Sequence, residues 1–366
     1  MWKRLPIILL VMVLPLLFSG CKYLFLREEQ PKTLEEKNNN EQDKTSLMKI
    51  KDFVDITQGI VSDVSPHGNE IIALKPQDDA SVSSPTDNTS INNLFIYDMR
   101  RKEEKTILAS QTSKSLGRFD PTGKGIYYLE SKDQSSYQLF WVDDEGNKKI
   151  KISSSEHEVN PRFYITSENN VFYGTKDGKI VKANKLGVLY SINIGEEYSI
   201  EQIYYSEEKD LVIFSAFKND VLSMYSVQPD GKNPTLFIEN ILGSFDISRD
   251  GTQLIYMTPI PDSNKRNLWL LTLDSTEESK LIEGYPQSAS FSPNGKKVLY
   301  TDKTDVNSDR QNIWILNLHN LESKQIASNL RIISRILWHP SNERILFSSY
   351  QLKDSQVQFF IHSLEF

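Results

Sequence analysis

The chain has 366 residues, of which 25% are charged and 10% aromatic, and its net charge at neutral pH is −7. An acidic chain lacks the basic footprint that nucleic-acid binding requires, so we expect no nucleic-acid partner. Cys21 is the only cysteine, which excludes a disulfide within the chain.

Residues 1–20 have the features of an export signal. Lys3 and Arg4 form a basic start, residues 5–18 form an apolar run, and Ser19-Gly20 supplies the small residues of a cleavage site. The apolar run is short for a transmembrane span. We therefore predict a signal peptide over residues 1–20.

The residues Phe18-Ser19-Gly20-Cys21 resemble the bacterial lipobox, in which the signal is cut before a cysteine whose thiol receives a diacylglycerol. Phe18 stands where that motif usually has leucine. The resemblance implies that Cys21 is lipidated and that the protein is extracytoplasmic and anchored to a bacterial membrane. That membrane is either the cell membrane of a Gram-positive cell or the periplasmic side of a Gram-negative envelope. The alternative is an ordinary signal peptide followed by an incidental cysteine.

Residues 22–50 are polar and charged, with few residues that form a core. Such a composition cannot bury enough apolar surface to offset the entropy of folding. We predict that residues 21–50 are the lipidated cysteine followed by a disordered tether, and that residues 51–366 form one folded domain.

One phrase recurs through residues 51–366: a turn near Ser-Pro-x-Gly, a second strand, and a third strand with an aromatic residue at its centre. The clearest copy has Phe291-Ser292-Pro293-Asn294-Gly295 at the turn, then strands at 298–300 and 312–316. Further copies have their turns at 64–68, 119–123, 247–251 and 338–342, and weaker ones span 162–181 and 203–225. A repeat of about 40–50 residues with four short strands is typical of propeller blades.

These copies predict an all-β fold, a single seven-bladed β-propeller of four-stranded antiparallel blades, with six or eight blades as the alternatives. The central aromatics of the third strands are interpreted as core packing between blades. A fourth strand follows each third strand except in the last copy, which ends at Phe366. Residues 51–56 resemble the other fourth strands but precede the first copy. We predict that this N-terminal strand pairs with the last blade and closes the ring, which removes an open sheet edge.

The turns and third strands resemble the TolB-type, WD-repeat-like β-propeller family, whose units read roughly Ser-Pro-Asp-Gly before a hydrophobic strand. The resemblance covers about residues 52–366. The closest copy is Ser292-Pro293-Asn294-Gly295, and no copy keeps the full motif. TolB-type domains commonly have six blades, fewer than predicted here. The resemblance implies a propeller that takes part in protein–protein interaction at a cell envelope.

No motif for catalysis or for a cofactor stands out. The chain has no G-x-S-x-G elbow, and residues 117–125 resemble a phosphate loop but lack Ser or Thr after Lys124. Residues 305–309 alternate oxygen ligands as a calcium loop does, but Arg310 replaces the turn glycine. The histidines lack metal-site spacing, although His67 and His339 occupy equivalent turns; they are His67, His157, His319, His339 and His362. We expect no enzyme activity, no cofactor and no metal, with a carboxylate-based hydrolase or lyase as an alternative.

The leading hypothesis is a noncatalytic, membrane-anchored envelope lipoprotein, a monomer that serves as a binding platform or scaffold for an unidentified envelope protein. Its long loops, residues 77–92, 259–266 and 302–311, are expected on one face, where recognition is common. The sequence names no individual ligand-binding residue. The alternatives are an extracytoplasmic receptor for cell-wall glycan or a small ligand, and a propeller-type lyase or hydrolase. Aromatic residues at the channel mouth would favour the receptor, whereas an exposed apolar patch would favour a protein partner.

Overall fold

The computed structural model describes residues 50–77, 92–131, 133, 136–155, 157–231, 234–353 and 356–366. Contacts divide the chain into two compact units, residues 1–30 and 31–366, and every described residue belongs to the second. The predicted signal peptide, Cys21 and all but the last residue of the predicted tether lie outside the described residues. None of the described segments is a helix of the length and apolar character needed to cross a membrane.

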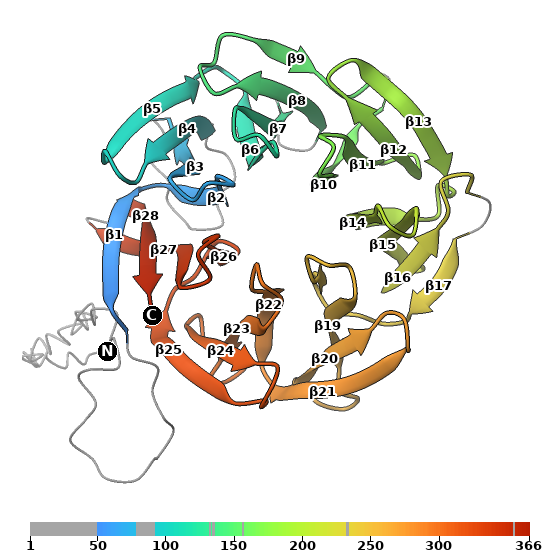
Figure 1. Ribbon diagram of the computed structural model, residues 1–366, viewed down its shortest axis with the longest axis vertical. Helices are drawn as coiled ribbons and strands as arrows, with labels where there is room; N and C mark the ends of the chain where they lie inside the picture. Colours follow the sequence, from blue (N-terminus) through green and yellow to red (C-terminus); the bar gives the residue numbers. More distant parts are fainter. Residues whose placement is uncertain are drawn as a thin grey trace, which may run out of the picture. The chain divides into compact units, whose positions relative to one another are not determined.

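The described strands are arranged as antiparallel sheets around a ring, so the predicted all-β propeller is confirmed (Figure 1). Five sheets have four strands each. They are β2–β5 (Ile60–Val64, Glu70–Pro76, Asn92–Asp98, Glu103–Leu108), β14–β17 (Ser199–Ser206, Leu211–Lys218, Val221–Val227, Thr235–Ile238), β18–β21 (Asp246–Ile247, Gln253–Pro259, Arg266–Thr272, Glu277–Gly284), β22–β25 (Pro286–Phe291, Lys297–Lys303, Gln311–Asn317, Ser323–Leu330), and β26–β28 (Leu337–Trp338, Arg344–Lys353, Gln356–Glu365) with β1 (Asp52–Gln58).

The predicted count of seven separate four-stranded blades is wrong, because the remaining strands form one eight-stranded sheet in place of two blades. Its strands are β6–β9 (Ser113–Phe119, Gly125–Ser131, Tyr137–Asp143, Lys149–Lys151) and β10–β13 (Val159–Ile165, Val171–Thr175, Lys179–Asn184, Gly187–Asn193). Strand β9 is short and covers only Phe140–Val142 of β8. The uncovered start of β8 is free to pair with β10, through Tyr137 and Val159.

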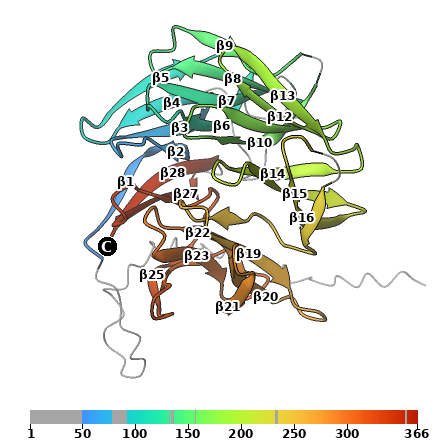
Figure 2. The same ribbon diagram turned by 45° about the vertical axis from the view of Figure 1, so that its right-hand side comes forward.

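The predicted closing strand is confirmed. Strand β1 pairs antiparallel with β28, from Asp52 opposite Glu365 to Gln58 opposite Phe360, with a bulge between Asp55 and Thr57. Figures 1 and 2 both show β1 lying beside β28 at the outer edge of that sheet. Residues near the start of the described chain therefore complete the sheet that holds its C-terminal strands.

In each copy of the repeat, the turn between the first and second strands has the same kind of backbone conformation. In the best copy, the Ser292 hydroxyl accepts a hydrogen bond from the Lys297 amide at 3.0 Å, and Gly295 adopts a left-handed φ of 69°. Asn169 and Asp210 adopt left-handed φ values of 64° and 44° in the corresponding turns of the two weaker copies. Asn and Asp tolerate this conformation better than most residues, so these copies keep the turn without the glycine.

The core lies between neighbouring sheets and is filled by the second and third strands. Their residues alternate between the two faces, so that Ile72 packs toward the next sheet while Ile71 and Ala73 pack toward the previous one. Core packing of the aromatic residues at the centre of the third strands is confirmed for Phe95, Phe140, Trp269, Trp314 and Tyr225. It was also predicted for Phe360, which belongs to none of the core clusters, whereas its neighbour Phe359 is buried in one. Packing thereby occupies the middle of each sheet and leaves the innermost strands to line the ring's centre.

Candidate ligand-binding channel

Two cavities, of about 390 and 610 Å³, lie among the innermost strands and share the lining residues Leu116, Arg118, Asp246, Ser334 and Arg335. The smaller cavity is lined mainly from β2, β22 and the segment that enters β26, and the larger from β10, β14 and β18. Strands β2, β6, β10, β14, β22 and β26 face the middle of the ring in Figure 1. The cavities therefore form a central channel, and we use that name for the two together.

Each of the seven sequence copies contributes a channel residue from the same position in the repeat. It is the inner-strand residue directly before the turn, as Ser290 precedes the turn at 291–295. Its Cα pairs with a buried residue of the second strand, as Ser290 pairs with Leu299. Its occupants are Asp63, Arg118, Tyr164, Tyr204, Asp246, Ser290 and Leu337. All of them line one or both cavities. We call this the channel position.

Two of these residues also hold neighbouring sheets together. An Asp63 carboxylate oxygen accepts a hydrogen bond from the backbone amide of Phe119 at 2.9 Å, and Asp246 accepts one from Phe291 at 2.8 Å. In both cases the donor is the last residue of the next inner strand. A buried backbone amide needs such an acceptor, so each aspartate links one sheet to the next.

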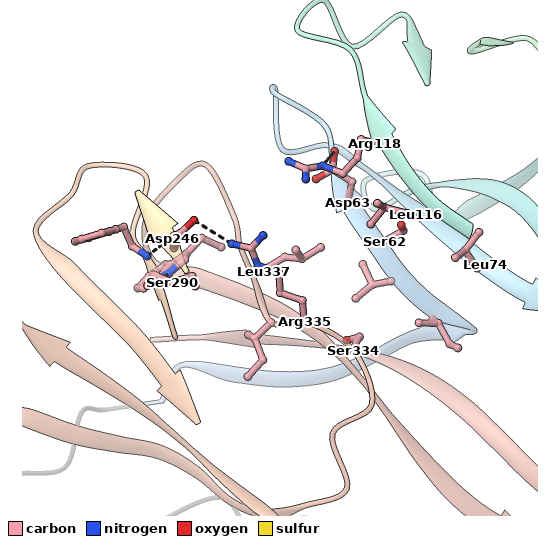
Figure 3. A pocket seen from close by; sticks show the side chains of 15 residues that line it. Ser62, Asp63, Leu74, Leu116, Arg118, Asp246, Ser290, Ser334, Arg335 and Leu337 are labelled. Carbon is pink, nitrogen blue, oxygen red and sulfur yellow. Dashed lines mark hydrogen bonds and ion pairs between the residues drawn. The ribbon is translucent and has the colours of Figure 1, made fainter. Parts of the chain in front are cut away.

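Each of these aspartates also faces an arginine. Arg335 Nη2 lies 3.2 Å from Asp246 Oδ1, and Arg118 Nε lies 3.6 Å from Asp63 Oδ2 (Figure 3). Burial raises the pKa of both carboxyl groups, and the facing arginines oppose that shift. The side chains of Asp63 and Asp246 keep 19% and 23% of their surface exposed, so channel water reaches them although protein surrounds them.

Arg162, on β10, has no such partner. Its guanidinium donates a hydrogen bond to the Gln202 amide oxygen at 3.3 Å, and among the described residues no carboxylate lies within ion-pair distance of it. Burial lowers the pKa of Arg162, the nearby positive charge of Arg335 lowers it further, and Glu201 opposes both. The side chain still reaches solvent, because the protein surrounding it encloses an open channel rather than a packed core.

Aromatic and amide side chains complete the larger cavity. The rings of Tyr164 and Tyr204 lie 5.1 Å apart at an interplanar angle of 60°. Burial raises the pKa of both phenols, which keeps them neutral and able to donate a hydrogen bond. Gln202 and Gln287 add amide groups to the same wall. The channel thus offers cationic, aromatic and amide groups, a combination suited to a polar ligand.

The candidate residues that the sequence suggests lie mostly elsewhere, and none of the five histidines lines the channel. His339 Nε2 donates a hydrogen bond to the backbone oxygen of Gly68 at 2.8 Å, so its turn does adjoin that of His67. Within the part of the chain that the structure describes, no three His, Cys, Asp or Glu residues are grouped to hold a metal. Of the described loop residues in 259–266 and 302–311, only Gln311 reaches the channel.

A second polar cluster, which no sequence motif indicates, lies at the ring closure. His362 on β28 lies between Ser349 on β27 and Asp55 on β1, with Nε2 2.6 Å from the serine hydroxyl and Nδ1 2.7 Å from the carboxylate. Burial lowers the pKa of His362, whereas Asp55 raises it. This order of groups occurs in serine hydrolases, but neither channel cavity includes any of the three residues. We infer that this cluster stabilises the pairing of the closing strand β1 with β28.

Comparisons with known proteins establish the fold. No protein-family model matches the chain, and no curated protein sequence matches it. Similar solved structures include an oligogalacturonate lyase in complex with manganese, 12% identical over 85% of this chain and 93% of that one, with a TM-score of 0.64. An oligogalacturonate lyase from Vibrio parahaemolyticus is 11% identical over 88% and 98%, with a TM-score of 0.63. TolB from Acinetobacter baumannii is 16% identical over 72% and 64%, with a TM-score of 0.49. The two lyase likenesses support a β-propeller fold.

Proposed function

We propose that the protein is a noncatalytic, lipid-anchored binding protein of the bacterial envelope whose central channel takes a saccharide or another small polar ligand. The observation that supports the proposal most strongly is that residues of different chemical types occupy the channel position. The second-strand residues opposite it are apolar or aromatic in every unit, as a repeated packing site requires. The channel position instead holds acidic, basic, aromatic, hydroxyl and aliphatic residues, all of which line the cavities.

A saccharide suits this lining. Tyrosine rings provide flat apolar faces with a polar edge, and amide and guanidinium groups provide directional donors. Tyr164, Tyr204, Gln202 and Gln287 supply these groups within one cavity of about 610 Å³. Two structural neighbours are named as lyases of oligogalacturonate, an oligosaccharide, which supports the same ligand class.

The anchor is part of the proposal. The predicted signal peptide and the lipobox-like residues before Cys21 support export and lipidation. Lipidation would hold the propeller at the membrane, on the side where wall or envelope saccharides are found. The ligand would then be met outside the cytoplasm.

A protein-binding platform remains the second candidate, because one apolar strip is exposed. At the β12–β13 hairpin, Leu186 is 96% exposed, and Val188 and Leu189 are about half exposed. Exposed apolar residues gathered in this way favour a protein partner. The strip lies outside the channel lining, so the two candidates can be tested separately.

The likeness to lyases raises catalysis as a third candidate. One of those structures is named as a complex with manganese. Manganese suits oxygen ligands such as carboxylates, and the described residues contain no group of three His, Cys, Asp or Glu side chains that could hold a metal. Besides Asp63 and Asp246, the polar side chains that line the channel include arginines, amides and phenols. These residues do not fit the metal, and we assign no reaction step to it.

Photo-cross-linking in intact cells tests the proposal. A photoreactive residue would replace Gln287 in the channel or, as the matched probe, Val188 in the exposed strip, in the full-length lipidated protein. We expect the channel probe to yield a small adduct, seen as a defined increase in intact mass, and the strip probe to yield background only. A dominant protein adduct at position 188, with nothing at position 287, would replace the proposal with the platform.

A further inference from the structure

The channel carries more positive than negative charge, although the chain as a whole is acidic. Among the described residues, Arg118, Arg162, Arg249 and Arg335 line its two cavities, whereas the acidic lining residues are Asp63 and Asp246. The net charge of the whole chain is −7. A cationic cleft in an anionic protein focuses the electrostatic potential on itself and attracts anions there.

The two aspartates are already engaged. Asp246 uses one oxygen for the Phe291 amide and the other for Arg335. Asp63 uses the same oxygen for the Phe119 amide and for Arg118. These contacts hold the sheets together and neutralise Arg335 and Arg118 in part. They leave no channel carboxylate for Arg162.

Like Arg249, Arg162 therefore lines the channel without an ion pair to any described residue, although the charge of Glu201 favours its protonated form. Its one hydrogen bond goes to the neutral amide of Gln202. The Arg335 charge is close enough to disfavour the protonated form of Arg162. In addition, Arg118 Nε is buried and has no hydrogen-bond partner, since its 3.6 Å separation from Asp63 exceeds a hydrogen bond. Arg162 thus has donor capacity open to the channel, and Arg118 adds a charge that Asp63 balances only in part.

We propose that the channel ligand carries a carboxylate or phosphate group and that Arg162, assisted by Arg118 and Arg335, binds it. The proposal rests on the proposed function, because it names the chemical class of the ligand at the same site. A guanidinium fork donates two parallel hydrogen bonds to such an anion, which an ammonium group cannot do. The bound anion removes the repulsion between Arg162 and Arg335, and the Tyr164–Tyr204 pair contacts the neighbouring part of the ligand.

Calorimetric titration of the purified full-length protein tests this inference with three probes. Trigalacturonate carries carboxylates, its fully methyl-esterified form is the neutral equivalent, and glycerol 3-phosphate carries a phosphate. We expect at least one anionic probe to bind more tightly than the neutral ester, and binding to weaken at high salt. Preference for trigalacturonate identifies a carboxylate, and preference for glycerol 3-phosphate identifies a phosphate.

Substitutions at Arg162 complete the test. Arg162→Gln should weaken binding of the preferred anion about tenfold or more, because a charge-assisted hydrogen bond is lost. Arg162→Lys should restore only part of the affinity, since it keeps the charge without the fork. Arg100→Gln, in the turn after β4 and outside the channel, is the control and should bind as the unsubstituted protein does. Melting curves of all variants establish that they are folded.

The outcomes separate this inference from the proposed function. If the neutral ester binds as tightly as the acid, and Arg162→Gln binds both unchanged, the channel binds saccharides but the anion inference is wrong. If neither anionic probe binds the unsubstituted protein, the anion inference is likewise overturned. The cross-linking at positions 287 and 188 then decides on its own whether the channel holds a ligand.

Discussion

Substitution of His362 by alanine should strongly destabilise the closed ring. His362 is only 1% exposed, and both of its ring nitrogens are hydrogen-bonded, to Ser349 and Asp55. Its ring also lies 5.5 Å from that of Phe53 and 5.0 Å from that of Phe347. The imidazole therefore joins β1, β27 and β28 through polar and packing contacts at one point.

The expected cost follows from these contacts. Alanine removes two hydrogen bonds, one of them to a carboxylate, leaves the Ser349 hydroxyl without its partner, and opens a cavity between two phenyl rings. Together these effects should lower the free energy of unfolding by about 3–5 kcal/mol. Asp55→Asn should cost less, about 1 kcal/mol, because the Asp55 side chain is 60% exposed and water can replace part of its role.

Urea denaturation at pH 7.5, followed by tryptophan fluorescence and by circular dichroism, measures the effect. His319→Ala is the matched control, because His319 lies in an exposed turn, and it should change stability by less than about 0.5 kcal/mol. If His362→Ala were as stable as His319→Ala, the cluster would not stabilise the pairing of β1 with β28, and the role that we assign to His362 would be wrong.

Four further outcomes are expected. Burial lowers the pKa of His362, so its neutral form is favoured by folding; stability should fall as pH drops below the unfolded value of 6.5, and less so in His362→Gln, as urea midpoints at pH 7.5 and 5.5 would show. Asp246→Ala should cost about 1–3 kcal/mol because the Phe291 amide loses its acceptor, whereas Asp246→Asn, which keeps an acceptor oxygen, should cost less in the same assay. Deletion of residues 49–57 should strongly lower the melting temperature, and an unchanged melt would contradict the closing role of β1. Cys21→Ser should move the protein from the membrane fraction to the soluble fraction, and retention at the membrane would argue against lipidation.

Much of the fold could be predicted because each copy of the repeat is marked by a few residues that form a single turn. Ser292 and Gly295 mark a turn whose hydrogen bond and left-handed residue are present in the structure. The closing strand could be predicted by elimination, since residues 51–56 resembled a fourth strand without a third strand before it. The sheet count could not, because it depends on one pairing between Tyr137 and Val159. That contact follows from the shortness of β9, which residue type does not reveal.

The channel residues were less accessible from the sequence. Arg118 falls within residues 117–125, which resemble an incomplete phosphate loop, and Arg162 opens a weak copy of the repeat, so neither belongs to a complete catalytic or metal motif. A signal was nevertheless present, because Asp63, Arg118 and Asp246 each lie directly before the turn of their copy. Comparison of that position across all copies would have shown its polar variety. Only the ring geometry shows that these positions converge on one channel.

Native mass spectrometry of the full-length protein, purified from the cells that produce it, tests the central claim most directly. The account predicts that the unsubstituted protein carries a bound species of defined mass that bears a negative charge when released, and that Arg162→Gln loses most of it. An Arg100→Gln preparation should retain the species. Absence of any such species from the unsubstituted protein, or equal amounts on the protein with and without Arg162, would contradict the assignment of the channel as the binding site for an anionic ligand.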